Sequence, residues 1–269
     1  MQINWRQAMV QKKLLAIGDV RAWVSGQGPA VVLCHGFTTT SEFWRSQAEE
    51  LSATHTVVCV NLPGHGISPA PRERAYTMAA FVNDLHAVFT TLGLKEAVLV
   101  GLSMGGTISQ LFALEHGSLL RGLVLVGATP HGLGEDVDAA RVLEAIEIYG
   151  VAKASQNVIE RSFAPLASRE LIDFGKAEVA QTPEHVARQA IVSLNVSDTR
   201  DQLSDIAVPT LVVCGTEDTI TPPRESVQLA AGIPGARLRM VEGAGHFPML
   251  EAPQAFNAIL GAFLAERTC

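Results

Sequence analysis

A serine flanked by glycines, Gly101-Leu102-Ser103-Met104-Gly105, most constrains what this chain can fold into. The apolar run 97–100 comes directly before it, and a stretch of helical character, 107–115, follows. Strand, Gly-x-Ser-x-Gly and helix in this order are typical of a tight turn that holds a serine strained at its apex. Glycines on either side remove side chains that would collide with neighbouring backbone. The pattern predicts a nucleophilic Ser103 at the N-terminus of a helix.

A nucleophilic serine needs a general base, and the base needs a third group to orient it. An acidic pair, Glu217 and Asp218, follows the apolar run 208–214, which has the composition of a buried strand. An acid just past the carboxyl end of a parallel strand points into the same crevice as the serine. Of the two acids we favour Asp218, because its shorter side chain, one step further into the loop, suits a fixed bond to imidazole. No carboxylate follows the other candidate strand, 122–126.

The candidate base is His246, one of eight histidines in the chain. It lies in a glycine-rich loop, 242–247, that follows the predicted strand 236–241. The order serine, acid, histidine along the chain matches one of the known orders of catalytic triads. We therefore predict a triad of Ser103, Asp218 and His246.

Two backbone N–H groups are needed to bind the oxyanion that forms during acyl transfer. Met104, the residue after the nucleophile, supplies one candidate amide. Phe37, in the loop after the apolar run 31–34, supplies the other, because Gly36 lets the backbone turn toward the serine. We interpret His35 as a structural histidine that hydrogen-bonds within this loop and not as a second base.

Apolar runs alternate with amphipathic stretches along most of the chain, which is the pattern of an α/β fold. The first two strands are expected in a hairpin near 9–25 that turns at Gly18-Asp19. We predict eight strands in a mostly parallel sheet with helices on both faces. The other strands are expected at 30–34, 56–61, 97–102, 120–126, 210–214 and 237–241, and the helices at 42–53, 77–92, 107–116, 224–231 and 253–267.

The segment 130–203 has helical stretches and no strand pattern, so we predict a helical cap inserted after the sixth strand. The α/β core then consists of 1–129 and 204–269. A cap in this position sets selectivity while the core supplies the chemistry. For its own residues, packing among the cap helices is the competing interpretation. The helices of the cap are expected at 139–149, 151–162, 168–176 and 183–194, and the candidate pocket side chains are Trp44, His131, Phe163, Ile220 and Phe247, with Phe37 and Met104 beside them.

Five segments spread over almost the whole chain carry a family resemblance. They are His35-Gly36-Phe37, Asn61 to Ser68, Gly101 to Gly106, Gly215 to Asp218 and Gly243 to His246. In combination they resemble the α/β-hydrolase superfamily and, within it, the 3-oxoadipate enol-lactonases and related small carboxylesterases. Asn61 and Pro63 depart from the family's usual Asp-x-Arg-Gly-x-Gly, which we expect to change local salt bridging and not the chemistry.

The resemblance and the predicted triad imply a serine hydrolase that cleaves a carboxylic ester or lactone through an acyl-enzyme intermediate, with no cofactor and no metal. Three alternatives stay open. A carbon–carbon bond hydrolase of aromatic degradation and a cofactor-free perhydrolase would use the same triad. A non-catalytic protein that binds a small ligand would share only the scaffold. Epoxide and haloalkane hydrolysis would need an aspartate in place of Ser103.

Composition excludes other classes of partner. The formal net charge of −7 disfavours a nucleic-acid surface, and the hydrophobic content of 48% is ample for a core on both faces of a sheet. The four cysteines show no disulfide pattern and no metal-ligand spacing with the histidines. We expect no signal peptide, and no apolar run reaches membrane-spanning length. We therefore expect a cytoplasmic protein with a small-molecule substrate and no nucleic-acid or membrane partner, and a homodimer is left open.

Overall fold

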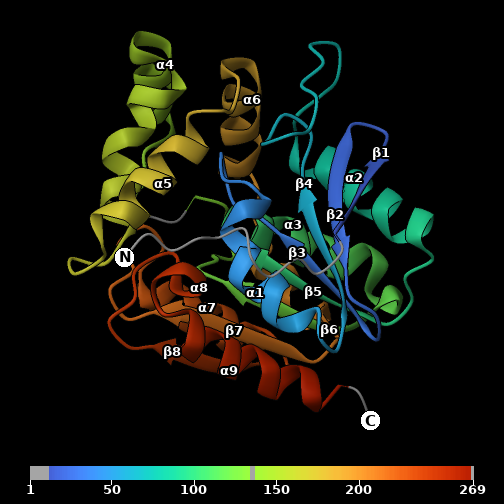
Figure 1. Ribbon diagram of the computed structural model, residues 1–269. Coiled ribbons are helices and arrows are strands. Elements are labelled where there is room, and N and C mark those ends of the chain that lie inside the picture. Colours follow the sequence, from blue (N-terminus) through green and yellow to red (C-terminus); the bar gives the residue numbers. More distant parts are fainter. Residues whose placement is uncertain (1–11, 134–136, 268–269) are drawn as a thin grey trace.

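The computed structural model describes residues 12–133 and 137–267. Its strands form one sheet of eight in the order β1-β2-β4-β3-β5-β6-β7-β8 (Figure 1). β1 and β2 form the predicted hairpin and pair antiparallel, β2 also pairs antiparallel with β4, and the remaining neighbours are parallel. The predicted sheet is thus confirmed. Its strands are β1 Lys13–Ile17, β2 Val20–Ser25, β3 Ala30–Cys34, β4 Thr56–Asn61, β5 Ala97–Leu102, β6 Leu120–Val126, β7 Thr210–Gly215 and β8 Arg237–Val241.

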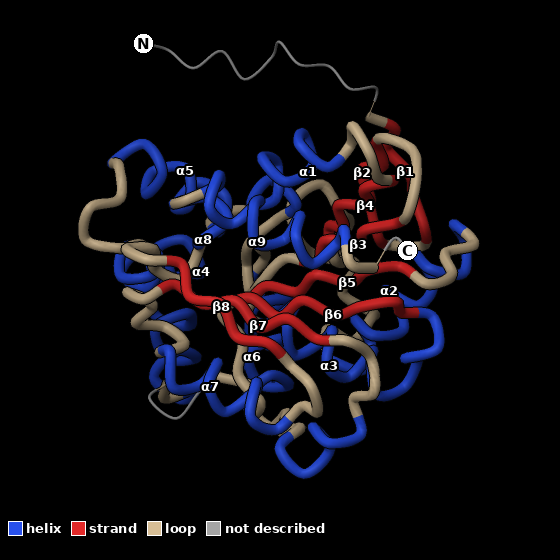
Figure 2. Tube along the Cα trace, turned by 90° about the horizontal axis from the view of Figure 1, so that it is seen from below, coloured by secondary structure: helices blue, strands red, loops and turns tan. Residues whose placement is uncertain are grey.

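Helices cover both faces of the sheet, as Figure 2 shows in cross-section. One face packs against α2 and α3 through buried side chains such as Phe81 and Phe112. The opposite face packs against α9 and the segment before α1, through Phe256 and Trp44. The helices of the core are α1 Arg45–Leu51, α2 Met78–Leu92, α3 Met104–His116, α7 Pro223–Gly232, α8 Pro248–Glu251 and α9 Pro253–Ala265, with short 3₁₀ turns η1 Ser41–Trp44, η2 Gly117–Leu119 and η3 Arg200–Asp205.

The central strands are apolar along their whole length because helices cover them on both sides. Every residue of β5 is buried, and β5 lies between β3 and β6. A parallel strand in this position has no solvent face, so its sequence shows a continuous apolar run instead of an alternation. This packing fixes the carboxyl ends of β3, β5 and β6, and these ends carry the predicted site.

The helical insertion, residues 130–203, lies between β6 and β7. Its helices are α4 Ala139–Ser162, α5 Arg169–Val179 and α6 Glu184–Asn195, which Figure 1 shows grouped together at the top of the molecule. A small cluster of Ile146, Val151 and Ala187 joins α4 to α6. The described part of the insertion contains no strand. Its assignment as a separate cap domain remains a proposal.

The two ends of the helical insertion lie side by side. The amide of Thr199 donates to the carbonyl of Pro130 at 2.7 Å, and the Thr199 hydroxyl oxygen lies 2.9 Å from the same carbonyl oxygen. Gln110 of α3 reaches both ends, because its Nε2 donates to the carbonyl of Thr129 at 2.9 Å and its Oε1 accepts from the Thr199 hydroxyl at 2.7 Å. The insertion therefore leaves and re-enters the core at one point, on the N-terminal half of α3.

α4 bends sharply at Gly150, between the two helices predicted for this stretch. Gly150 has φ 74° and ψ 164°, a backbone conformation that is open essentially to glycine alone. No helix in the described residues has the length and apolar character needed to cross a lipid bilayer.

Candidate active site

Ser103 lies in a strained turn between β5 and α3. Its φ of 51° is in the left-handed region that residues with a side chain rarely adopt. The Ser103 amide donates to the carbonyl of Val126 on β6 at 2.9 Å, and the Ser103 carbonyl accepts from the amide of Gly106 at 2.7 Å. The turn is therefore held at both of its backbone groups. α3 begins directly after it at Met104, earlier than the sequence pattern predicts.

The glycines of the serine motif are required by close contacts. A Cβ atom on Gly101 would lie 2.3 Å from the carbonyl oxygen of Gly105, and one on Gly105 would lie 2.4 Å from the carbonyl oxygen of His35. Neither backbone group can move without breaking the packing of β3, β5 and α3. The motif therefore encodes close approach of three backbone segments around the serine.

Asp218 and His246 form a buried hydrogen-bonded pair. The His246 Nδ1 lies 2.9 Å from the Asp218 Oδ2, and the two residues are only 4% and 3% exposed. Asp218 follows β7 and His246 follows β8, as the sequence predicts. The partner of the imidazole is Asp218, while Glu217 is exposed to solvent.

The Asp218 carboxylate is held by the loop that follows it. Its Oδ1 accepts from the amides of Ile220 and Thr221, each at 2.9 Å, and its Oδ2 accepts from the Thr221 hydroxyl at 2.8 Å. Burial by itself raises the pKa of Asp218, but the charge and hydrogen bond of His246 and the bonds from Thr221 outweigh burial and hold the pKa below its ordinary value. An ionised, immobile carboxylate can fix the orientation of the imidazole. The sequence analysis did not identify Thr221 in this role.

Gly127, at the end of β6, connects the serine turn with the acid–base pair. Its preceding residue, Val126, accepts the Ser103 amide hydrogen bond. A Cβ atom on Gly127 would lie 3.0 Å from the His246 Nδ1 and 3.3 Å from the Asp218 Oδ2. The structure thus brings the three predicted catalytic residues around the carboxyl end of β6. The sequence signal for this contact point is Gly127, a glycine directly after a buried strand, and its role is not among the sequence-based predictions.

The loop after β3 carries the predicted oxyanion amide of Phe37. A Cβ atom on Gly36 would lie 3.2 Å from the Ser103 Cβ, so this loop touches the serine. Thr38 has a positive φ of 56°, which turns the chain directly after Phe37. Within the described residues, the amides of Phe37 and Met104 donate to no other protein group. Both amides are therefore available to bind an anion beside Ser103.

The loop after β3 is braced by polar contacts with β4. His35 is fully buried, its Nδ1 contacts the carbonyl of Gly36 at 2.8 Å, and its Nε2 accepts from the amide of Leu62 at 3.1 Å. Burial and the neighbouring His65 keep the pKa of His35 well below its ordinary value, which suits a structural role. Asn61, in place of the acid usual in the family, accepts from the Ser41 amide and donates to the Ser41 hydroxyl. An amide makes both contacts, whereas a carboxylate could only accept.

The predicted pocket residues separate into two groups. The rings of Phe163 and Phe247 pack at a tilt of 58° with centroids 5.1 Å apart, and the Phe247 ring lies edge to face with the His246 ring at 5.1 Å. Ile220 is half-buried beside Asp218 through its amide. These three residues lie next to the acid–base pair.

Trp44 and His131 have other immediate partners. Trp44 is fully buried and packs on Phe256 of α9, within the same apolar cluster that contains Phe163 and Phe247. The His131 Nε2 lies 2.8 Å from the carboxylate of the buried Glu225 on α7. Both side chains thus have partners inside the protein. These partners do not favour binding of substrate by Trp44 or His131, which stays a prediction.

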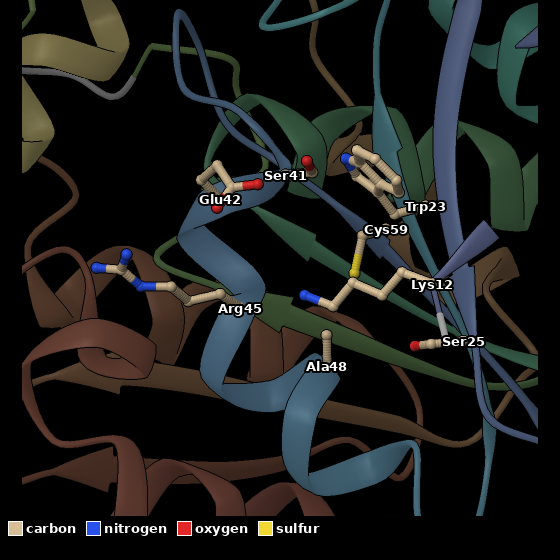
Figure 3. Close-up of a pocket in the computed structure, with 8 residues that line it drawn as sticks. All are labelled: Lys12, Trp23, Ser25, Ser41, Glu42, Arg45, Ala48 and Cys59. Atoms are coloured by element: carbon tan, nitrogen blue, oxygen red, sulfur yellow. The ribbon is translucent and has the colours of Figure 1, made fainter. Parts of the chain in front are cut away.

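Figure 3 shows a surface hollow of about 130 Å³. It is lined by residues of the β1–β2 hairpin side and of α1, and none of the predicted site residues lines it. The lining residues are Lys12, Trp23, Ser25, Ser41, Glu42, Arg45, Ala48 and Cys59. Burial raises the pKa of the Cys59 thiol to about 12, so this thiol is a weak nucleophile. In the described residues no cluster of three or more His, Cys, Asp or Glu side chains has the arrangement of a metal site.

Comparison with known proteins identifies the family of this chain. The family model described as "Alpha/beta hydrolase family" matches residues 31–259. The chain belongs to the alpha/beta hydrolase family. Its predicted membership is confirmed, and this alpha/beta hydrolase is a hydrolytic enzyme by family.

Its relatives include esterases and lactonases. It is similar to an esterase from Exiguobacterium antarcticum, with 26% identity, a TM-score of 0.86 and coverage of 94% of this chain and 99% of that one. It is also similar to Est816, described as an N-acyl homoserine lactone degrading enzyme, with 30% identity, a TM-score of 0.82 and coverage of 93% and 100%. 3-Oxoadipate enol-lactonase 2 of Acinetobacter baylyi is 27% identical over 88% of each chain. The predicted similarity to enol-lactonases is thereby confirmed.

Proposed function

We propose that this hydrolase cleaves a carboxylic ester or lactone of a small substrate through a covalent acyl-serine intermediate. The observation that carries the proposal is the buried hydrogen bond between Asp218 and His246 beside the strained turn of Ser103. The arrangement supplies a nucleophile, a base and a group that orients the base. The esterase and lactonase relatives support esters and lactones as the substrate class.

In the first step His246 removes the proton of the Ser103 hydroxyl as its oxygen attacks the substrate carbonyl. The Nδ1–H group of His246 donates to Asp218. The Nε2 atom of the same ring is therefore the one that accepts the proton of Ser103. The Asp218 carboxylate stabilises the resulting imidazolium, and the bonds from Thr221 keep that carboxylate in place. His246 then protonates the leaving alcohol, and the acyl group stays on Ser103.

In the second step His246 activates a water molecule that attacks the acyl-serine carbonyl. The free acid leaves and Ser103 regains its proton. In both steps the negative charge of the tetrahedral intermediate is bound by the amides of Phe37 and Met104. One such donor contributes about 3–4 kcal/mol to lowering the barrier.

We also propose that the helical insertion acts as a cap that selects the substrate. The side chain of Phe37 packs against the cluster of Ile146, Val151 and Ala187, so the insertion contacts the residue that supplies an oxyanion amide. Phe163 at the end of α4 stacks on Phe247 beside His246. These contacts favour a small apolar acyl group over an extended charged substrate.

The test is hydrolysis of p-nitrophenyl acetate, butyrate and decanoate by the wild-type protein and by Ser103→Ala, both checked for folding by circular dichroism. We expect turnover by the wild type that is lost in Ser103→Ala, and faster hydrolysis of the shorter chains. A fluorophosphonate should add covalently to the wild type at Ser103 and leave the variant unlabelled, as seen by mass spectrometry. Wild-type turnover that survives in Ser103→Ala would refute the proposal. Absence of turnover on all of these esters and on an enol-lactone would also refute it. Activity on a vinylogous diketone alone would instead identify a carbon–carbon hydrolase.

A further inference from the structure

Glu251, the last residue of α8, accepts hydrogen bonds from two separate parts of the chain. Its Oε1 accepts from the amides of Gly245 and Phe247, at 3.0 and 3.1 Å, which are the residues on either side of His246. Its Oε2 accepts from the amide of Ala164, at 2.7 Å, just beyond the end of α4 in the helical insertion. One carboxylate thus binds the histidine loop with one oxygen and the insertion with the other.

The same two segments also contact each other directly. The amide of His246 donates to the carbonyl of Ser162, the last residue of α4, at 2.7 Å. A Cβ atom on Gly245 would lie 2.6 Å from the Ala164 nitrogen and from the Ser162 oxygen, so no gap separates them. Each of the three amides from Gly245 to Phe247 is therefore bonded to Glu251 or to the end of α4.

The environment of Glu251 makes its carboxylate costly to replace. The residue is partly buried, and burial raises its pKa above the ordinary value although the three backbone N–H groups and the charge of His246 act in the opposite direction. Hydrogen bonds to a charged acceptor are about twice as strong as neutral ones. Removal of the carboxylate would leave partly buried amides without an acceptor.

We propose that Glu251 is a positioning residue that sets the place of His246 and docks the end of α4 onto the histidine loop. The inference rests on the proposed function, in which His246 is the general base. It adds that the base and the predicted pocket residue Phe163, next to Ala164, are aligned by a single side chain. The end of α4 cannot move away from the core without removing an acceptor from the His246 amide.

Two substitutions separate the two roles. Glu251→Gln retains one acceptor oxygen. We expect this oxygen to face the amides of Gly245 and Phe247, because two hydrogen bonds are kept in that orientation. The NH₂ group of the glutamine then faces the Ala164 amide, and that hydrogen bond is lost. We expect a rise in KM of about tenfold with kcat within about threefold of wild type, because only the docking of α4 is weakened. Glu251→Ala removes all the bonds, and we expect kcat to fall by at least about tenfold as well.

The experiment measures kcat and KM for p-nitrophenyl butyrate with wild type, both variants and the control Glu242→Gln, which removes an exposed carboxylate from the same loop. Active sites are titrated with a fluorophosphonate, so that loss of folded protein does not count as loss of rate. A merely structural role predicts lowered unfolding midpoints with unchanged kcat and KM per titrated site. That result would overturn the inference, as would equal changes of kcat in both variants and in Glu242→Gln. If Glu251→Ala does not fold, the KM increase of Glu251→Gln decides alone. Failure of the proposed function would be seen separately, as activity that persists in Ser103→Ala.

Discussion

Ser103 adopts a left-handed backbone conformation that glycine would adopt without strain. The conformation costs a residue with a side chain about 1 kcal/mol or more. In this turn the strain is held by the bonds of the Ser103 amide and carbonyl to Val126 and Gly106. The serine is therefore retained against the local preference of the backbone, as expected where a side chain serves chemistry.

The strain can be measured by comparing two inactive variants. Ser103→Gly should be more stable to unfolding than Ser103→Ala by about 1 kcal/mol, because glycine accommodates the φ of 51° and alanine does not. Both variants should lack esterase activity. Urea unfolding of the two proteins provides the measurement, and equal midpoints would show that the turn is not strained.

The orienting role belongs to Asp218 and not to its neighbour Glu217. Asp218→Asn places an amide NH₂ group where the imidazole needs an acceptor, which favours the wrong tautomer of His246. We expect kcat for p-nitrophenyl butyrate to fall by about 10³–10⁴-fold. Glu217→Gln is the matched control in the adjacent, exposed position, and its kcat should stay within about twofold of wild type. A comparable loss in the control would assign the acid to Glu217.

Buried neutral histidines make the protein less stable in acid. Burial lowers the pKa of His65 from 6.5 to about 4. Between these values the unfolded chain binds a proton that the folded protein excludes, so stability falls as pH decreases from 6.5 to about 4. The loss amounts to about 1.4 kcal/mol per pH unit for this residue.

The measurement is the difference in unfolding free energy between pH 6.5 and 4.5 for the wild type and His65→Gln. The wild type should lose about 2–3 kcal/mol more than the variant over this range. His35 is present in both proteins, so its own contribution cancels. Parallel pH dependences would contradict an excluded proton at His65.

At the residue scale the sequence locates the acid–imidazole pair better than the packing of the aromatic side chains. Asp218 and His246 could be brought together because each lies in the loop after a predicted strand, and these strands end at the same edge of the sheet. Trp44 could not be placed from sequence, since the face of the sheet on which a buried aromatic packs depends on η1 and α9 together. The partner of His131 could not be predicted for a similar reason, because Glu225 is 94 residues away in the sequence and lies on another helix.

Among the elements, the start of α3 and the bend of α4 show how local backbone constraints act. α3 begins at Met104 because Ser103, Gly105 and Gly106 have no bulky side chains to prevent close packing on β3 and β6. Glycines usually indicate that a helix has not yet begun, so the sequence pattern placed the start later. In α4 the same residue type marks a real interruption, since Gly150 separates two helical stretches that the sequence also predicts as separate helices.

Gly150 offers a clean test of this backbone constraint. A Cβ atom there would meet nothing within 4 Å, so any cost of Gly150→Ala comes from the backbone conformation alone. We expect destabilisation by about 1–3 kcal/mol. Gly261→Ala is the matched control, because Gly261 also has open space around it but lies inside α9, where alanine should stabilise by about 0.5–1 kcal/mol. Thermal unfolding of both variants decides, and a change of the same sign in both would rule out the constraint.

For the molecule as a whole, the parallel direction of the core strands follows from the alternation of apolar runs and helices, because parallel neighbours need crossover connections. The arrangement of the helical insertion does not follow in the same way. The insertion's helices are half-exposed, and the apolar cluster within it is small. Its position therefore depends on contacts with the core, such as the hydrogen bond from the Thr182 hydroxyl to the carbonyl of Thr38 and that from the Tyr76 amide to Gln189. These pairs join residues more than 100 positions apart, and no local pattern announces them.

The adjoining ends of the helical insertion have a consequence for how such proteins diversify. Pro130 and Thr199 are joined by a hydrogen bond, so the chain between them begins and ends at the same point of the core. The entropic cost of closing this segment grows only slowly with its length, so the segment can be lengthened, shortened or exchanged at little cost. Such a change leaves the register of β6 and β7 unaltered. A different cap can therefore replace this one at the same junction without a shift of β6 or β7, provided that it again supplies an acceptor to the His246 amide, as Ser162 does here.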